Sequence, residues 1–195
     1  MTAPVNKTAL RVRLRGLRRR LAAEVHDAAE RAAARLPIER LPPFKVFSLY
    51  TPMGSEMDPR PLLEPLRRRG ALAALPAAGA RDAALSFRLW DPSMPLAPDA
   101  FGILAPPPLA KEVEPDLVIA PLLAFDRAGR RLGQGAGHYD RTLAILRARK
   151  PVFVVGLGFS GQEIDQLPEE AHDERLDAIL TEAGYMTVSP GLRRS

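Results

Sequence analysis

Short apolar runs, separated by prolines and polar turns, make up most of the chain after residue 43. Several runs are nearly continuous in hydrophobic side chains, which is typical of strands covered on both faces of a sheet. The segments predicted as β-strands are 44–50, 72–75, 85–90, 117–120, 152–157 and 186–188. Between them, helices are predicted at 59–69, at 141–149 and at about 176–183. This alternation predicts an α/β fold with a mostly parallel sheet.

The N-terminal segment has a different period. Leu10, Leu14, Leu17 and Leu21 recur at intervals of four, three and four residues, which places one apolar stripe along a helix. We predict that this basic amphipathic helix spans about residues 7–35. Because the apolar stripe has to be covered, we expect the helix to pack on the rest of the fold.

The composition is that of an ordinary globular protein, with 195 residues, 46% hydrophobic and 26% charged. It fits a single domain over residues 1–195 and excludes a disordered or collagen-like chain. The longest nearly uninterrupted apolar run, 117–125, is far shorter than the ~20 residues of a membrane-spanning helix. No apolar stretch follows the basic start as in a signal peptide. We therefore expect a cytoplasmic protein with no membrane partner.

The chain has no cysteine. A disulfide, a thiolate metal site and a cysteine nucleophile are thereby excluded, and any metal must take oxygen or imidazole ligands. Magnesium together with phosphate groups fits such a ligand set.

The net charge of +5 points toward a nucleic-acid partner until the charges are located. Seven basic and no acidic side chains fall within residues 1–20, so the remainder carries a small net negative charge. The basicity therefore belongs to the N-terminal helix, as a solvated face, a nucleic-acid-binding surface or an anion site. Lys7 and Arg11 lie one helical turn apart and are the pair best placed to hold an anion together.

Three alternating glycines precede the predicted helix 141–149. Gly133, Gly135 and Gly137 would let the backbone approach a ligand closely and turn its amides toward one point, beside a helix N-terminus. Such a loop suits phosphate, and Arg130 and Arg131 would add positive charge. The spacing matches neither the Walker pattern nor the dinucleotide fingerprint, and a tight strand-to-helix connection is the alternative interpretation.

Two acidic residues are candidate metal ligands. Asp140 lies at the start of the helix after the glycines, where an aspartate commonly caps backbone amides. Next to a phosphate-binding loop it is also what a magnesium ion bridging protein and nucleotide would require. Asp173 lies in a polar segment, 172–177, and either caps the last predicted helix or faces the same ion.

Several motifs follow one another in order along nearly the whole chain. The densest is 120–140, from Ala120-Pro121 through Asp126 to Tyr139-Asp140. The others are Lys7 with Leu10-Arg11, Tyr50 with Glu56-Met57-Asp58, segment 85–90, Phe101-Gly102-Ile103, Pro106 and His172-Asp173. Together they resemble the signature of the 5-formyltetrahydrofolate cyclo-ligase family, also called 5,10-methenyltetrahydrofolate synthetase.

The resemblance implies a three-layer α/β/α, Rossmann-like fold and an ATP-dependent ligase. The reaction would be the ATP- and magnesium-dependent conversion of 5-formyltetrahydrofolate to 5,10-methenyltetrahydrofolate, with release of ADP and phosphate. ATP would activate the formyl oxygen by phosphorylation before the ring closes. The expected partners are these two small molecules, with no nucleic acid, and the expected state is a monomer.

The resemblance also implies roles for individual residues. It makes Lys7, Arg131 and Asp140 catalytic and assigns the metal ion to Asp140 and Asp173. The folate substrate would contact Thr51, Glu56, Gln134, Gly135, Ala136, Gly137 and His138. ATP would contact Lys7, Arg11, Arg131, Leu132, Gly133, Gln134, Gly135, Ala136, Gly137, His138 and Tyr139.

Three residues depart from the family pattern. Gln134 stands where an arginine is common, and Arg130 or Arg127 is the candidate to supply the missing charge. Ala136 replaces a glycine, which is tolerable only at negative φ, and His138 replaces an aromatic residue. The changes at Gln134 and Ala136 leave open a folate-binding relative without turnover. The basic N-terminal helix leaves open a nucleic-acid-binding protein as the other alternative.

Overall fold

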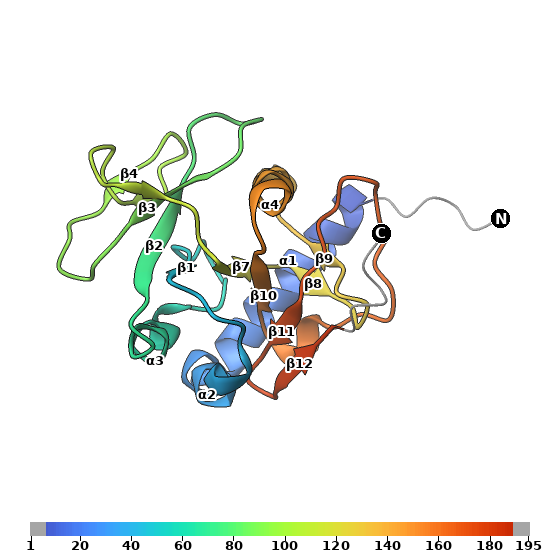
Figure 1. The fold of residues 1–195 in the computed structure, drawn as a ribbon. Helices are drawn as coiled ribbons and strands as arrows, with labels where there is room; N and C mark the ends of the chain where they lie inside the picture. Colours follow the sequence, from blue (N-terminus) through green and yellow to red (C-terminus); the bar gives the residue numbers. More distant parts are fainter. Residues whose placement is uncertain (1–6, 189–195) are drawn as a thin grey trace.

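The parallel strands expected from the sequence form the centre of a mixed sheet (Figure 1). The computed structural model describes residues 7–188, and within them the sheet has eight strands in the order β12-β11-β10-β7-β1-β2-β3-β6. The five central strands run parallel, and the edge strands pair antiparallel. The central strands are β1 (Val46–Ser48), β2 (Leu72–Ala77), β7 (Leu117–Pro121), β10 (Phe153–Leu157) and β11 (Ala178–Leu180). The other strands are β12 (Tyr185–Thr187) at one edge, and β3 (Ser86–Leu89) followed by β6 (Glu112–Val113) at the other edge.

Helices cover both faces of this sheet, with α4 on one side and α2 and α3 on the other (Figure 1). Leu143 and Leu146 of α4 belong to one buried cluster, and Leu66 of α3 belongs to another. Val118 joins the first cluster and its neighbour Ile119 the second, because successive side chains of a strand point to opposite faces. The predicted three-layer α/β/α arrangement is therefore confirmed. The helices are α1 (Lys7–Glu24), α2 (Ala28–Arg35), α3 (Leu63–Arg67) and α4 (His138–Arg149).

Short elements connect the sheet strands. Two ribbons of two-residue strands were not predicted, because a strand this short has no detectable period. They pair β4 (Ala97–Pro98) with β5 (Leu104–Ala105), and β8 (Ala124–Phe125) with β9 (Arg131–Leu132). Single 3-10 turns are η1 (Ile38–Arg40), η2 (Arg60–Leu62) and η3 (Ser160–Gln162).

The leucine stripe of the N-terminal helix packs as expected. Leu14 is buried in a cluster with the ribbon β8-β9, and Leu10 and Leu17 pack against the same cluster. Leu21 packs one turn further along against the core beneath α2 and α3. The stripe therefore fixes α1 across the molecule, with its first turns beside the glycine loop that follows β9.

The single helix predicted for 7–35 is wrong, because α1 ends at Glu24 and α2 begins at Ala28. The intervening Val25, His26 and Asp27 are weaker helix formers than the residues on either side. The break also changes the direction of the chain, so that Ala28 and Ala32 lie buried in the core. The burial of these two alanines therefore favours two helices over one continuous helix.

The helix predicted for about 176–183 is also wrong. Ala178–Leu180 is the strand β11, paired with β10 on one side and β12 on the other. All three residues are buried. A short apolar run does not distinguish a buried strand from a helix, and here the open edge of β10 decides the outcome.

Most other predicted segments exist with shifted bounds. The helix predicted for 59–69 consists of η2 followed by α3. The last long helix, α4, begins at His138 rather than Arg141. Each of the six predicted strands overlaps a strand of the sheet. The single domain predicted for 1–195 stays a prediction, since residues 1–6 and 189–195 lie outside the described part.

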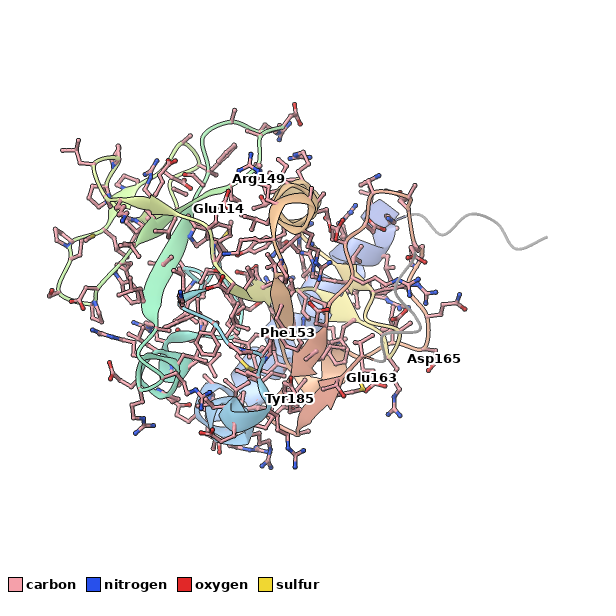
Figure 2. All side chains as sticks on the ribbon, viewed as in Figure 1. Glu114, Arg149, Phe153, Glu163, Asp165 and Tyr185 are labelled. Carbon is pink, nitrogen blue, oxygen red and sulfur yellow. The ribbon has the colours of Figure 1, made fainter. Side chains whose placement is uncertain are left out.

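Ion pairs tie the helices to the connections around the sheet. Figure 2 shows Glu114 and Arg149 side by side, and their side chains form an ion pair of 2.5 Å. This contact holds the last turn of α4 to the segment that leads into β7.

Within residues 7–188, no helix combines the length and the apolar character needed to cross a membrane.

Gly156 in β10 offers a test of core packing. A Cβ at this position would lie 2.5 Å from Cδ1 of Leu176 and 2.8 Å from Cδ2 of Leu122. We expect Gly156→Ala to lower the free energy of unfolding by about 1–3 kcal/mol, because the buried leucines must shift. Urea denaturation followed by circular dichroism measures the change.

Gly16→Ala is the matched comparison for this test. Gly16 lies within α1, and a Cβ there meets nothing within 4 Å. We expect this change to stabilise the fold by about 0.5–1 kcal/mol, since alanine is the better helix former. Equal effects of the two substitutions would contradict the packing argument.

Candidate active site

A cavity of about 390 Å³ lies where the chain changes direction along the sheet. The chain passes from β1 to β2 on one side and then returns to place β7 on the other side of β1. Such a switch point leaves a crevice at the carboxyl ends of the strands. Tyr50 and Thr51 after β1, Ala78 after β2, and Pro121 and Leu122 at the end of β7 line the cavity.

The cavity brings together every residue to which the family resemblance assigned a catalytic, ligand-binding or metal-binding role. Lys7 and Arg11 enter from α1, Thr51 and Glu56 from the segment after β1, and Asp173 from the loop before β11. The remaining lining residues among those predicted are Arg131, Leu132, Gly133, Gln134, Gly135, Ala136, Gly137, His138, Tyr139 and Asp140. Residues more than 160 positions apart thus share one cavity.

The glycine loop connects β9 to α4 and depends on glycine at two positions. Gly135 has φ +114° and Gly137 has φ +68°, values that residues with a side chain rarely adopt. Within residues 7–188 no other residue type has positive φ, so Ala136 is free of the strain that a positive φ would cause. Gly137 is the N-cap of α4 and offers no side chain to the helix amides, which suits a bound anion.

Two arginines of α1 hold this loop. Nε of Arg11 donates a hydrogen bond to the carbonyl oxygen of Gly133, at 3.1 Å. Arg15 donates from Nε to Oε1 of Gln134 at 3.1 Å and from Nη2 to its carbonyl oxygen at 3.0 Å. The basic face of α1 is therefore directed at the loop along these turns.

Arg131 and Asp140 form an ion pair at the inner wall of the cavity. Nη2 of Arg131 lies 2.8 Å from Oδ1 of Asp140, and the Arg131 side chain is only 3% exposed. The guanidinium also lies over the ring of Tyr139, 5.5 Å from its centroid. Oδ1 of Asp140 accepts a second hydrogen bond from the amide of Glu174, at 3.2 Å. Asp140 therefore does not cap α4, the ordinary role considered for it from sequence.

The hydroxyl of Tyr139 is buried and has no hydrogen-bond partner among the described residues. Burial raises the pKa of this phenol, and the negative charge of Glu56 raises it further. The hydroxyl therefore stays protonated and can act only as a neutral donor or acceptor.

Asp173 lies in a group of side chains at the mouth of the cavity. Nζ of Lys7 is 3.2 Å from Oδ2 of Asp173 and 3.2 Å from Oε1 of Glu170. Glu170, His172 and Asp173 place one ligand atom each within 4.8 Å of one another. Asp140 is not part of this group. Asp140 is linked to the group through a hydrogen bond from the amide of Glu174, the residue after Asp173.

Thr51, His138 and Phe101 also line the cavity. Oγ1 of Thr51 donates to the carbonyl oxygen of Leu104 at 2.6 Å. The ring of His138 meets that of Phe101 edge to face at 5.6 Å, and its Nδ1 lies 2.9 Å from the carbonyl oxygen of Ala83. His138 therefore makes an aromatic contact with Phe101.

Arg130 and Arg127 were the residues expected to supply the positive charge that is missing at Gln134, and the structure shows that this expectation is wrong. Arg127 is 78% exposed and pairs with Glu163, whereas Arg130 pairs with Asp126 and Glu169. Neither lines the cavity. The guanidinium that contacts Gln134 is that of Arg15, which sequence reasoning missed.

Other lining residues were also missed. Asp99, in the turn between β4 and β5, was not singled out at all, whereas Tyr50 and Phe101 fell within the motifs of the resemblance but were given no role at the site. The one available signal for Arg15 was its spacing of four residues from Arg11, which repeats the spacing of Lys7 and Arg11.

Comparisons with known proteins identify a family and several relatives of this chain. The family model described as the 5-formyltetrahydrofolate cyclo-ligase family matches residues 3–182. Proteins named 5-formyltetrahydrofolate cyclo-ligase from Mycolicibacterium smegmatis and Escherichia coli K12 are 38% and 34% identical over 139 residues. These alignments cover 68% of the chain and 71% of the first relative, and 69% and 76% for the second.

Solved structures show the same fold. An NMR structure of the 5,10-methenyltetrahydrofolate synthetase of Aquifex aeolicus is 29% identical, with a TM-score of 0.71 over 97% of this chain and 95% of that one. A 5,10-methenyltetrahydrofolate synthetase from Mycoplasma pneumoniae is 23% identical, with a TM-score of 0.69 over 91% and 99% of the two chains; at that identity the likeness concerns the fold alone. Because the family model covers most of the sequence and two relatives exceed 30% identity over two thirds of it, the chain belongs to the 5-formyltetrahydrofolate cyclo-ligase family.

Proposed function

We propose that this chain catalyses the ATP-dependent conversion of 5-formyltetrahydrofolate to 5,10-methenyltetrahydrofolate, with release of ADP and phosphate. Family membership and the identity to proteins of that name support this activity. The observation that carries it is the single cavity shared by a glycine loop, basic side chains of α1 and the carboxylate of Glu56. A nucleotide and a folate can meet there.

The chemistry needs positioning and charge neutralisation. A formamide oxygen is a poor leaving group, so the γ-phosphoryl group of ATP is first transferred to it and ADP departs. The neighbouring anilino nitrogen then attacks the imino-phosphate carbon and releases its proton to solvent, and phosphate leaves as the ring closes. Phosphoryl transfer of this kind requires no protein nucleophile, which suits a chain without cysteine.

In the part of the cavity where we expect ATP, the glycine loop and three basic side chains would bind its phosphate groups. Lys7, Arg11 and Arg131 would contact the phosphate oxygens, together with loop amides and Tyr139. Lys7 and Arg11 are engaged with protein acceptors in the structure, so nucleotide binding would exchange these contacts for phosphate oxygens. Lys7 and Arg131 act catalytically by stabilising the charge that develops on the transferred group.

At the folate end, Glu56 would accept hydrogen bonds from N–H groups of the pterin, with Thr51 in the same pocket. Residues 134–138 would lie between the two substrates, which accounts for their assignment to both. Gln134 is neutral, and Arg15 supplies positive charge beside it.

We also propose that the reaction uses Mg²⁺, held by Asp140 and Asp173. Both are hard oxygen donors, as this ion prefers. These residues fit the ion, because one oxygen of Asp140 is free to bind it. Oδ1 of Asp140 accepts the hydrogen bonds from Arg131 and Glu174, whereas Oδ2 accepts none from the described residues. When bound, the ion neutralises phosphate charge. Asp140 would further keep Arg131 oriented toward the cavity through their ion pair.

A spectroscopic assay for 5,10-methenyltetrahydrofolate, with and without ATP and magnesium, tests the proposal. We expect product only when 5-formyltetrahydrofolate and both additions are present. Folate binding without product would favour the relative that has lost turnover. Product formed equally well without magnesium would overturn the metal proposal alone.

We propose in addition that the protein acts in the cytoplasm, as a monomer and without nucleic acid. Arg11 and Arg15 engage the glycine loop rather than forming a free surface for a polynucleotide. Polynucleotide binding that weakens steeply with salt, together with no thermal shift from ATP, would support the nucleic-acid alternative instead. Analytical ultracentrifugation tests the monomer.

Lys7→Met tests the nucleotide end. The side chain of Lys7 is 16% exposed and lies at the cavity. Losing one charge-assisted phosphate contact should weaken ATP binding by about 1.5–3 kcal/mol. Isothermal titration measures the affinity, and Lys45→Met, an exposed lysine outside the cavity, is the control. An unchanged ATP affinity would show that Lys7 does not bind the nucleotide and has only a structural role.

A further inference from the structure

One arginine of α1 is buried rather than solvated. Arg18 is 4% exposed, while its neighbours Arg19 and Arg20 on the same helix are exposed. A buried guanidinium is costly unless its charge and its N–H groups are satisfied. The partners of Arg18 therefore indicate what it is there to hold.

The partners of Arg18 come from both connections that border the cavity. Nε donates to Oγ of Ser55 at 3.2 Å. Nη1 lies 3.2 Å from Oε1 of Glu56 and 3.4 Å from the carbonyl oxygen of Leu122. Ser55 and Glu56 follow β1, and Leu122 follows β7, so one guanidinium connects the two strands that define the switch point.

Glu56 is held from three sides. Its Oε1 accepts from Arg18 and, at 3.1 Å, from Nε2 of Gln134. Its Oε2 accepts from the amide of Met53 at 3.0 Å. The Glu56 side chain is 4% exposed, and Arg18 is the one cation with which it forms an ion pair among the described residues. Arg18 thus both balances the carboxylate charge and sets its orientation.

We propose that Arg18 is a positioning residue for folate binding, which acts by holding the Glu56 carboxylate in place for the N–H groups of the substrate's heterocycle. The inference rests on the proposed function, because it takes Glu56 as the residue that contacts the folate. Arg18 itself lies behind Glu56 and does not line the cavity. Its loss should therefore affect the folate and spare ATP.

The test compares Arg18→Met, Arg18→Lys and the control Arg19→Met. Arg18→Met removes the charge and the donors at similar length, and we expect the KM for 5-formyltetrahydrofolate to rise about 10- to 100-fold. The KM for ATP and kcat should change by less than about threefold. Arg18→Lys keeps the charge and should recover most of the lost affinity, and Arg19→Met should equal the wild type.

A double variant separates positioning from a merely structural role. In a Glu56→Gln background, Arg18→Met has no carboxylate to act on, so its further effect on the folate KM should be less than about twofold. This double variant also removes the uncompensated charge that a single change would bury. It therefore keeps the test valid should Arg18→Met alone fail to fold.

Three results would overturn the inference. The first is an unchanged folate KM in Arg18→Met, the second is an equal rise in the KM values for folate and ATP, and the third is an undiminished effect in the Glu56→Gln background. Should the wild type form no product, the proposed function fails separately. Direct titration with 5-formyltetrahydrofolate then decides on Arg18, since an unchanged dissociation constant would still refute its role.

Discussion

Asp140→Asn is expected to lower kcat by about 10³-fold, the largest effect of any single change at the site. The substitution keeps the size of the side chain but removes the charge that would hold a divalent ion. It also removes the ionic partner of Arg131, which is almost fully buried. Initial rates measured over a range of magnesium concentrations test this expectation.

The control for Asp140 is Asp165→Asn. Asp165, labelled in Figure 2, is exposed and does not line the cavity, so its charge should not affect turnover. Asp165→Asn should keep the melting temperature of the wild type, whereas Asp140→Asn should lower it, because Arg131 loses its ionic partner. Circular dichroism at the assay temperature therefore separates loss of catalysis from loss of fold. Activity of Asp140→Asn within tenfold of the wild type would remove Asp140 from the metal site.

Arg131→Met should lower kcat/KM for ATP by about 10²- to 10³-fold. The Arg131 guanidinium is fixed by Asp140 and stacked on Tyr139, so it is in place before phosphate charge develops. A preorganised cation in a shielded cavity stabilises that charge more than a mobile surface cation does. Steady-state kinetics with varied ATP measures the effect.

Arg127→Met is the matched control, because Arg127 lies in the turn between β8 and β9 and pairs with Glu163 at the surface, outside the cavity. It should leave kcat/KM unchanged. Because Arg131 and Asp140 act as one unit, the double variant should lose less than the product of the two single losses. Fully multiplicative losses would show that the two side chains act independently.

The features of this protein that could be predicted from the sequence are those that depend on neighbouring residues in the chain. The leucine stripe is complete within four turns of α1, and it predicted a helix that packs on the body of the fold. The apolar runs of β7 and β10 predicted buried strands. Alternating glycines before a helix predicted the loop on which the site is built, and the ordered motifs predicted the residues that now share one cavity.

Other features were decided only by contacts between distant segments. Residues 178–180 became a strand because β10 offered an open edge, and the helix broke after Glu24 because α2 buries its alanines against the sheet. Arg15 rather than Arg130 stands beside Gln134, since Arg130 is taken by Asp126. Arg18 is buried because Glu56 lies opposite it. Hydrophobic periodicity describes one element at a time, whereas the pairing of charges and strand edges depends on which elements meet in space.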